Sequence, residues 1–131
     1  MKRILLIVDD DPIVRLMIQR MVHNIDSSVN CHQCDDGKVG LAVLETLQNS
    51  PDFIIVLLDI NMPVLNGWGF LDSLKKINLD SFNKFQLYII TSSIDESDKL
   101  KAQSYPVIMR LYHKPLSKLD IKEILDFNET T

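Results

Sequence analysis

Five polar residues of this sequence have side chains that could do chemistry together. Asp9 and Asp10 are adjacent, Asp59 lies near the middle of the chain, and Thr91 and Lys114 follow it. Three carboxylates in one crevice would repel one another, so at least one should have a raised pKa. A divalent cation would remove that repulsion, and a few hard oxygen ligands with room for water suit Mg²⁺ better than Zn²⁺ or a calcium cage.

Lys114 and Thr91 suit the oxygens of a phosphoryl group. Lys114 would add a positive charge to the crevice, and Thr91 would add a hydroxyl donor. Metal, ammonium and hydroxyl together stabilise the charge that is spread over phosphoryl oxygens. The Asp59 carboxylate could then act as a nucleophile and form an aspartyl phosphate. Taken singly, each of these residues is more simply a loop, cap or surface residue, so the interpretation depends on their joint arrangement.

Each of these residues follows a segment that the sequence predicts to be a strand. The expected strands span residues 4–8, 27–34, 53–58, 87–90 and 107–112. Most are short apolar runs, typical of strands buried on both faces of a parallel sheet, and the polar second one fits a sheet edge. Ligands bind beyond the carboxyl ends of such strands. We therefore expect the polar residues to meet at one rim of the sheet.

Helices are expected between these strands, with recognisable starts. Asp11 can cap a helix with Pro12 at its first position, and Ser117 can cap the last helix. Ser93 and Glu96 have the spacing of a capping box for a short helix that must stop before Pro106. Further helices are expected to end near residue 48 and to start near residue 67, followed by a polar link over 78–85. Five strand-then-helix units predict an α/β sandwich with a parallel sheet and right-handed crossovers.

Composition sets limits on the class of protein. The chain has 131 residues, 46% of them hydrophobic, and a net charge of −4. This predicts one globular domain and argues against nucleic-acid binding, which needs clustered Lys and Arg. No apolar run is long enough to span a membrane. Residues 1–8 resemble a signal peptide only briefly, because aspartates follow without a cleavage site, so we expect a cytoplasmic protein.

The two cysteines form a C-x-x-C in an apparently extended segment. Their spacing of three would point the thiols of Cys31 and Cys34 to opposite faces of a strand. One such pair with one nearby His cannot supply four zinc ligands. We therefore expect two free thiols that are buried or half-buried.

Four motifs together resemble the receiver domain of two-component response regulators. They are Val-Asp-Asp at 8–10, Leu-Asp-Ile-Asn-Met-Pro with Asn-Gly at 58–67, Ile-Thr-Ser at 90–92 and Lys-Pro at 114–115. The resemblance covers essentially the whole chain. It implies a flavodoxin-like, doubly wound (βα)5 three-layer sandwich whose five parallel strands run in the order 2-1-3-4-5.

The resemblance also implies roles for the acidic residues. Asp59 resembles the phosphoacceptor, which receives its phosphoryl group from a phosphohistidine of a histidine kinase or a histidine phosphotransfer protein. Asp10, Asp59 and the backbone carbonyl of Asn61 resemble the Mg²⁺ ligands. Asp9 would contact the metal directly or through water.

Further roles and two departures concern the later motifs. Thr91 and Lys114 resemble the residues that bind phosphoryl oxygens, and the bond before Pro115 is similar to the family's cis peptide. The family usually has Tyr or Phe three residues before the lysine, but here Leu111 stands there and Tyr112 follows. The common Gly-Ala before the fifth strand is replaced by Ser-Tyr-Pro at 104–106.

The expected output is signalling through a partner. Residues 1–131 are expected to form a single receiver without an output domain, similar to chemotaxis receivers and monomeric or weakly dimeric. It would pass its phosphate on in a relay, or bind an unknown downstream protein when phosphorylated.

Two other functions stay open, and a third, flavin binding, is disfavoured. An Mg²⁺-dependent phosphatase with an Asp nucleophile would need a second Asp where Asn61 stands. A phosphate-independent interaction module would have no need of the acidic pair, Thr91 or Lys114. Flavin binding fits the fold, but Asp9, Asp10 and Asp11 would repel a phosphate.

Overall fold

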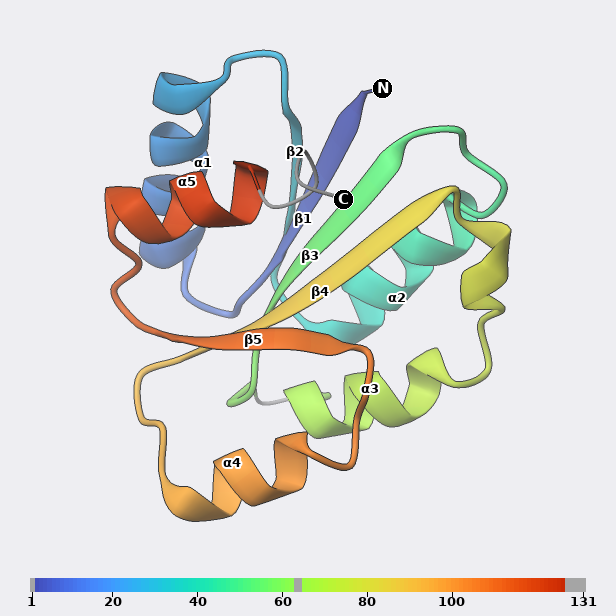
Figure 1. Cartoon of the computed structure of the whole chain (residues 1–131), viewed down its shortest axis with the longest axis vertical. Coiled ribbons are helices and arrows are strands. Elements are labelled where there is room, and N and C mark those ends of the chain that lie inside the picture. Colours follow the sequence, from blue (N-terminus) through green and yellow to red (C-terminus); the bar gives the residue numbers. More distant parts are fainter. Residues whose placement is uncertain (1, 63–64, 127–131) are drawn as a thin grey trace.

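The computed structural model describes residues 2–62 and 65–126, which form one five-stranded sheet with helices on both faces (Figure 1). The strands are β1 (Arg3–Val8), β2 (Asn30–Cys34), β3 (Phe53–Asp59), β4 (Lys84–Thr91) and β5 (Ile108–His113). The helices are α1 (Pro12–Ile25), α2 (Gly37–Thr46), α3 (Gly67–Leu74), the short 3-10 helix η1 (Leu79–Ser81), α4 (Glu96–Ala102) and α5 (Lys118–Asp126). Pro63 of the motif at 58–67 and the expected tail at 127–131 lie outside the described residues.

The strands are all parallel and run in the order β2-β1-β3-β4-β5. The predicted fold class and strand order are therefore confirmed, and β2 lies at an edge as expected. The register aligns the strand ends, since Val8 pairs with Leu58 and Thr91 pairs with His113. Because parallel strands end at the same edge, the residues that follow them converge there.

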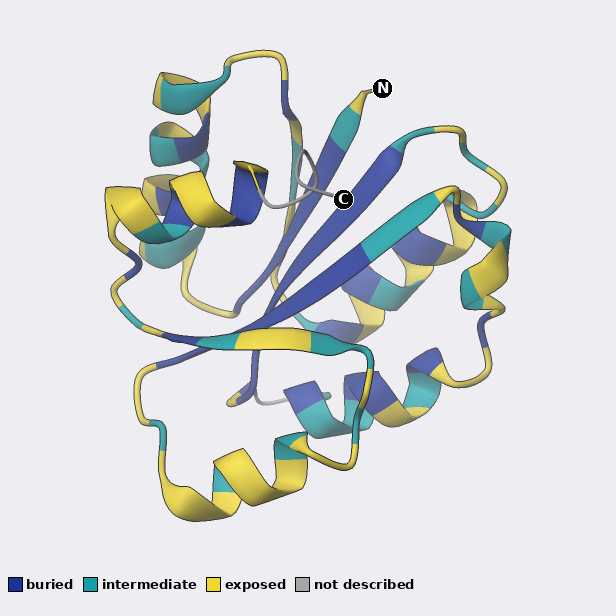
Figure 2. Ribbon diagram, in the orientation of Figure 1, coloured by how far each residue is buried: buried dark blue, intermediate teal, exposed yellow. Residues whose placement is uncertain are grey.

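Two separate apolar layers hold the helices onto the sheet. α1 and α5 lie over one face, and α2 and α3 over the other (Figure 1). Successive residues of a strand point to opposite faces, so Ile7 packs under α1 and α5 while Val8 packs under α2 and α3. Every residue of β3 is buried (Figure 2). Burying one such Leu, Ile or Val side chain contributes about 1.5–3 kcal/mol relative to exposure.

Two of the predicted helix starts are confirmed. The Asp11 carboxylate accepts a hydrogen bond from the Ile13 N–H, and Pro12 is the first residue of α1. At α5, the Asp120 N–H donates to the Ser117 hydroxyl at 3.0 Å, and the Ser117 N–H donates to the Asp120 carboxylate at 3.0 Å. Each pair satisfies backbone groups that have no partner within the first turn.

The predicted start of α4 is wrong. Asp95, not Ser93, is the N-cap, and its carboxylate accepts the Asp98 N–H at 2.8 Å. Asp is as strong a cap as Ser, and Asp95 is directly next to the helix. The Ser93 N–H and carbonyl instead contact the Thr91 hydroxyl, which lies at the end of β4.

The bounds of several elements also differ from the prediction. β2 is shorter than residues 27–34, and β3 includes Asp59 itself. The link at 78–85 contains η1, in which the Asp80 N–H donates to the Asn78 side chain. β4 begins at Lys84 because it pairs with β3 from Phe53 onward, which extends the strand beyond its apolar run.

The cysteines match the prediction. Both are free, and Cys34 is buried on the α2–α3 face while Cys31 packs against the α1–α5 face. Burial raises the pKa of each thiol to about 11, so both stay protonated and unreactive near neutral pH.

Within residues 2–62 and 65–126, every helix is too short or too polar to cross a lipid bilayer.

Candidate functional site

Three carboxylates meet at the carboxyl edge of the sheet. Asp9 follows β1, Asp10 comes next, and Asp59 ends the neighbouring strand β3. Each offers an oxygen within 4.8 Å of the others. Asp9 is 0% exposed and Asp59 is 3% exposed, whereas Asp10 is open to solvent. The cluster is thus buried at Asp9 and Asp59 and open to solvent at Asp10.

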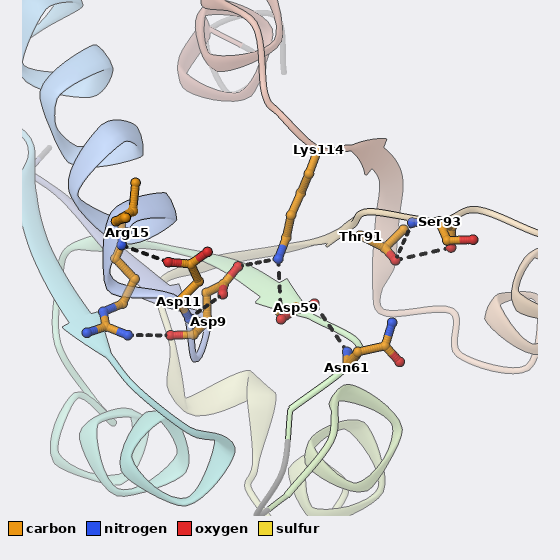
Figure 3. Close-up of polar contacts among 9 residues, drawn as sticks. Asp9, Asp11, Arg15, Asp59, Asn61, Thr91, Ser93 and Lys114 are labelled. Atoms are coloured by element: carbon orange, nitrogen blue, oxygen red, sulfur yellow. Dashed lines mark hydrogen bonds and ion pairs between the residues drawn. The ribbon is translucent and has the colours of Figure 1, made fainter.

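Lys114 reaches into this cluster from the loop after β5. Its Nζ lies 2.6 Å from Asp9 Oδ2 and 3.3 Å from Asp59 Oδ2 (Figure 3). The Lys114 N–H donates to the Thr91 carbonyl at 2.7 Å, and the bond to Pro115 is cis. Burial alone would lower the pKa of Lys114, but the hydrogen bond to Asp9 and the charge of Asp59 raise it overall. The ammonium group therefore stays charged between two buried carboxylates.

The carboxyl group of Asp59 is harder to ionise than a free aspartate. Burial is the largest cause, the charge of Asp9 adds to it, and together they raise the pKa of Asp59 to about 6. The Lys114 ammonium and the Asn61 N–H, which donates to Asp59 Oδ1 at 3.1 Å, oppose that shift. The expectation that one carboxylate of the cluster has a raised pKa is confirmed.

The donor set of this cluster fits Mg²⁺. It offers hard carboxylate oxygens from three residues, and the exposure of Asp10 leaves room for bound water. Asp9 Oδ2 is buried, and its partner among the described residues is the Lys114 ammonium at 2.6 Å. A carboxylate oxygen can accept more than one interaction, so a metal ion or its bound water would add a further partner to this buried oxygen.

Thr91 lies at the end of β4 with its side chain fully buried. Its hydroxyl donates to the Ser93 carbonyl at 3.2 Å and accepts the Ser93 N–H at 3.3 Å (Figure 3). The hydroxyl is thus engaged with the loop that leads to α4. It would have to exchange this contact to reach a phosphoryl oxygen.

Leu111 and Tyr112 face opposite sides of the sheet. Leu111 packs against the α2–α3 layer and lines a surface cavity of about 390 Å³ together with Ile94 and Ala102 of the α4 region. Tyr112 is buried in the α1–α5 layer, where its hydroxyl donates to the Glu123 carboxylate at 3.4 Å. The aliphatic residue thus occupies the face next to α4, and the aromatic residue occupies the other.

Two residues that shape the site were not singled out in the sequence as part of it. Gly67 lies against the loop after β3, where its N–H donates to the Ile60 carbonyl at 2.8 Å. A Cβ on Gly67 would lie 2.8 Å from the Asp59 carbonyl oxygen, so only glycine fits. The Arg15 guanidinium donates to the Asp9 carbonyl at 2.7 Å. The Asn-Gly pair at 66–67 could have indicated the first contact, but no local pattern indicates the second.

The sequence of residues 5–126 matches the family model of the response regulator receiver domain. This chain therefore belongs to the response regulator receiver domain family, whose members are signalling domains of two-component systems. Receiver domains bind Mg²⁺ at an acidic pocket, and this chain has an acidic cluster at Asp9, Asp10 and Asp59.

Individual relatives differ in length. The chain is 28% identical over 98 residues to the nitrate/nitrite response regulator NarL of Escherichia coli, but this alignment covers 75% of the chain and only 42% of NarL. It is 28% identical over 123 residues to the chemotaxis protein CheY1 of Helicobacter pylori, and here 93% of each protein is covered.

Solved structures show the same architecture. A two-component response regulator from Cytophaga hutchinsonii superposes with a TM-score of 0.86 at 25% identity, covering 100% of both chains. One from Legionella pneumophila superposes with a TM-score of 0.82 at 26% identity, covering 99% of this chain and 100% of the other.

Proposed function

We propose that Asp59 accepts a phosphoryl group from a phosphohistidine and that the phosphorylated protein signals through a partner. The observation that carries this proposal is the position of the Asp59 carboxylate, which lies 3.3 Å from Lys114 Nζ and within the acidic cluster. With a pKa of about 6, Asp59 is mostly ionised near neutral pH and can act as a nucleophile.

The transfer forms one bond and breaks one. A carboxylate oxygen of Asp59 attacks the phosphorus, and an O–P bond forms while the N–P bond to the donor imidazole breaks. The imidazole nitrogen leaves with the bonding electrons and takes up a proton. Lys114 and Thr91 bind the phosphoryl oxygens, so that charge developing on them meets an ammonium and a hydroxyl donor.

A magnesium ion fits the acidic side of this site. Asp10, Asp59 and the carbonyl of Asn61 would hold it, with Asp9 in contact directly or through water. When bound, Mg²⁺ neutralises charge on the carboxylates and on the phosphoryl oxygens. Asp10 is the ligand most open to solvent, which suits a metal that keeps several waters.

The partners follow from this chemistry. The donor is a histidine kinase or a histidine phosphotransfer protein. The same residues that stabilise the transfer to Asp59 also assist the later hydrolysis of the aspartyl phosphate. The output is either phosphorylation-dependent binding of a downstream protein or transfer of the phosphoryl group along a relay.

A phosphatase that acts on small molecules is less well supported. Such an enzyme needs an acid–base carboxyl group near the nucleophile. Two residues after Asp59 stands Asn61, whose amide side chain cannot exchange a proton in that role.

Intact mass spectrometry tests the proposal. Incubation with an acyl phosphate and Mg²⁺ should add one phosphoryl group to the wild-type protein and none to Asp59→Asn. Asp52→Asn, which changes an aspartate at the opposite end of β3, should be labelled like the wild type. Equal labelling of Asp59→Asn would rule out Asp59 as the acceptor.

A further inference from the structure

Arg15 contacts the peptide group that joins the two adjacent aspartates of the site. Its Nη1 donates to the Asp9 carbonyl oxygen at 2.7 Å (Figure 3). Arg15 lies in the first turns of α1, while Asp9 directly follows β1. The contact therefore spans the loop that carries Asp10.

The other groups of Asp9 are also fixed. Its N–H donates to the Cys34 carbonyl at 3.0 Å, and its Oδ1 accepts the Asp11 N–H at 2.9 Å. Its Oδ2 pairs with Lys114 at 2.6 Å. Asp9 is thus held to β2, to the loop and to the end of β5, and Arg15 supplies the contact to its carbonyl.

This contact bears directly on Asp10. The Asp9 carbonyl and the Asp10 N–H belong to one planar peptide unit, so holding the oxygen holds the plane from which Asp10 extends. Asp10 is the exposed carboxylate of the cluster, and the ion pairs with Lys114 go to Asp9 and Asp59. Its direction therefore depends on its backbone more than on partners of its side chain.

The guanidinium group is itself oriented by β2. Arg15 Nε donates to Gln33 Oε1 at 3.3 Å, and Gln33 Nε2 donates to Gln19 Oε1 at 2.9 Å. Two N–H donors of the planar guanidinium group, Nε and Nη1, thus connect the edge strand β2 to the β1–α1 loop. A lysine would keep the charge, but its single ammonium cannot hold both acceptors in this geometry.

We propose that Arg15 is a positioning residue of the metal site: it fixes the Asp9–Asp10 peptide so that the Asp10 carboxylate points at the bound Mg²⁺. The inference rests on the proposed function, because it assumes that the acidic cluster binds Mg²⁺. Arg15 touches neither the metal nor the phosphoryl group and acts through the backbone.

Charge and position predict opposite results for Arg15→Ala. Removing a positive charge beside three carboxylates would tighten Mg²⁺ binding if Arg15 acted only by its field. Losing the fixed peptide would weaken binding, because the Asp10 ligand would no longer be pre-oriented. Arg15→Lys keeps the charge and isolates the second effect.

Mg²⁺ titrations of the full chain, followed by amide NMR shifts, measure this affinity independently of phosphorylation. We expect the Kd for Mg²⁺ to rise on the order of tenfold in Arg15→Lys and Arg15→Ala. Gln33→Leu should raise it less, since it frees the guanidinium without removing it. Arg20→Ala, which removes an exposed arginine of the same helix, should leave the Kd within about twofold of the wild type.

Each result separates the possibilities. A Kd in Arg15→Lys equal to or below that of the wild type overturns the positioning role, and tighter binding in Arg15→Ala shows an effect of charge. Arg15→Lys retains charge and helix propensity, so it keeps the test valid if the alanine variant does not fold. Asp59 labelling of the wild type at saturating Mg²⁺ is measured alongside. If the wild type is labelled while the Arg15 variants bind Mg²⁺ as tightly as the wild type, only the positioning role of Arg15 is refuted. If the wild type binds no Mg²⁺, both the positioning role and the proposed function are refuted.

Discussion

Lys114 Nζ lies closer to Asp9 than to Asp59, at 2.6 Å against 3.3 Å. The two carboxylates are nearly inaccessible to solvent, so each would be strongly destabilised as an anion without this cation. Lys114 thus offsets part of the charge that a bound metal would neutralise. Lys114 and a bound Mg²⁺ would both reduce the repulsion between the Asp9 and Asp59 carboxylates. The effect of each on the free energy of unfolding would therefore depend on the other.

Removing Lys114 should make the protein more dependent on Mg²⁺. Lys114→Met leaves Asp9 and Asp59 without their cation and should lower the free energy of unfolding by about 2 kcal/mol in metal-free buffer. The loss is limited because Asp59, with a pKa of about 6, can take up a proton. Mg²⁺ should then raise the melting temperature of the variant more than that of the wild type.

Thermal denaturation with EDTA or with excess Mg²⁺ measures both effects. Lys122→Met, on the exposed side of α5, is the matched control and should respond to Mg²⁺ like the wild type. A Lys114→Met variant as stable as the wild type in EDTA would contradict the role of this ion pair.

Acid should stabilise the metal-free site. The pKa of Asp59 in the folded protein, about 6, lies above the unperturbed value of 3.8, so the folded state binds more protons between these values. Asp59 therefore contributes stability that is fully present below pH 3.8 and lost as the pH rises through about 6, on the order of 3 kcal/mol. Asp59→Asn should remove this pH dependence and be more stable than the wild type near neutral pH.

Urea denaturation in EDTA between pH 3.8 and neutral pH measures the free energy of unfolding of each protein. Asp80→Asn, at an exposed aspartate of η1, is the control and should keep the pH dependence of the wild type.

The sequence predicted the arrangement of the strands and much of the site. Asp9, Asp59 and Lys114 each follow a short apolar run, and parallel strands place their carboxyl ends at one edge whatever the details of packing. The meeting of these three side chains depends only on topology, which the strand-then-helix pattern determines. The order of the strands came from the family resemblance and was confirmed.

Contacts that depend on side-chain rotamers were not predictable. The Arg15 guanidinium reaches the Asp9 carbonyl across a loop, and no periodicity or propensity encodes that contact. The Thr91 hydroxyl bonds to Ser93 because the loop after β4 curls back over it. The prediction of the α4 N-cap failed for a related reason. Ser93 and Asp95 are both good N-cap residues, and the conformation of the loop determines which of them caps the helix.

Gly67 should tolerate no side chain. A Cβ there would lie 2.8 Å from the Asp59 carbonyl oxygen and 2.8 Å from Ile60 Cα, both of them backbone atoms that cannot step aside. Gly67→Ala should therefore destabilise the protein by about 1–3 kcal/mol and weaken Mg²⁺ binding by displacing Asp59. Gly69→Ala is the control in the same helix, because its Cβ would come closer than 3 Å only to the end of the Leu65 side chain, which can rotate away. Urea denaturation should show a change within about 1 kcal/mol for Gly69→Ala; equal effects of the two substitutions would contradict this account.

Phosphorylation should move Leu111 and leave Tyr112 in place. A phosphoryl group on Asp59 adds charge and acceptor oxygens, which should draw the Thr91 hydroxyl away from Ser93 and release the loop before α4. Leu111 lines the cavity next to that loop, so an aliphatic side chain must fill any space that Thr91 vacates. Tyr112 is held on the opposite face by Glu123 and by the Tyr88 ring, whose centroid lies 5.9 Å away.

NMR spectra with and without a beryllium fluoride mimic of the phosphoryl group, in the presence of Mg²⁺, decide this prediction. The largest changes should fall on residues 91–104 and on the Leu111 methyl groups, while the Tyr112 ring signals stay nearly constant. Leu44, buried in α2 away from this loop, serves as the internal control and should not shift. Asp59→Asn should abolish the response, because it removes the carboxylate that we propose as the phosphoryl acceptor. Rotation of the Tyr112 ring with an unchanged Leu111 would show that the signal leaves the site through the α1–α5 face instead.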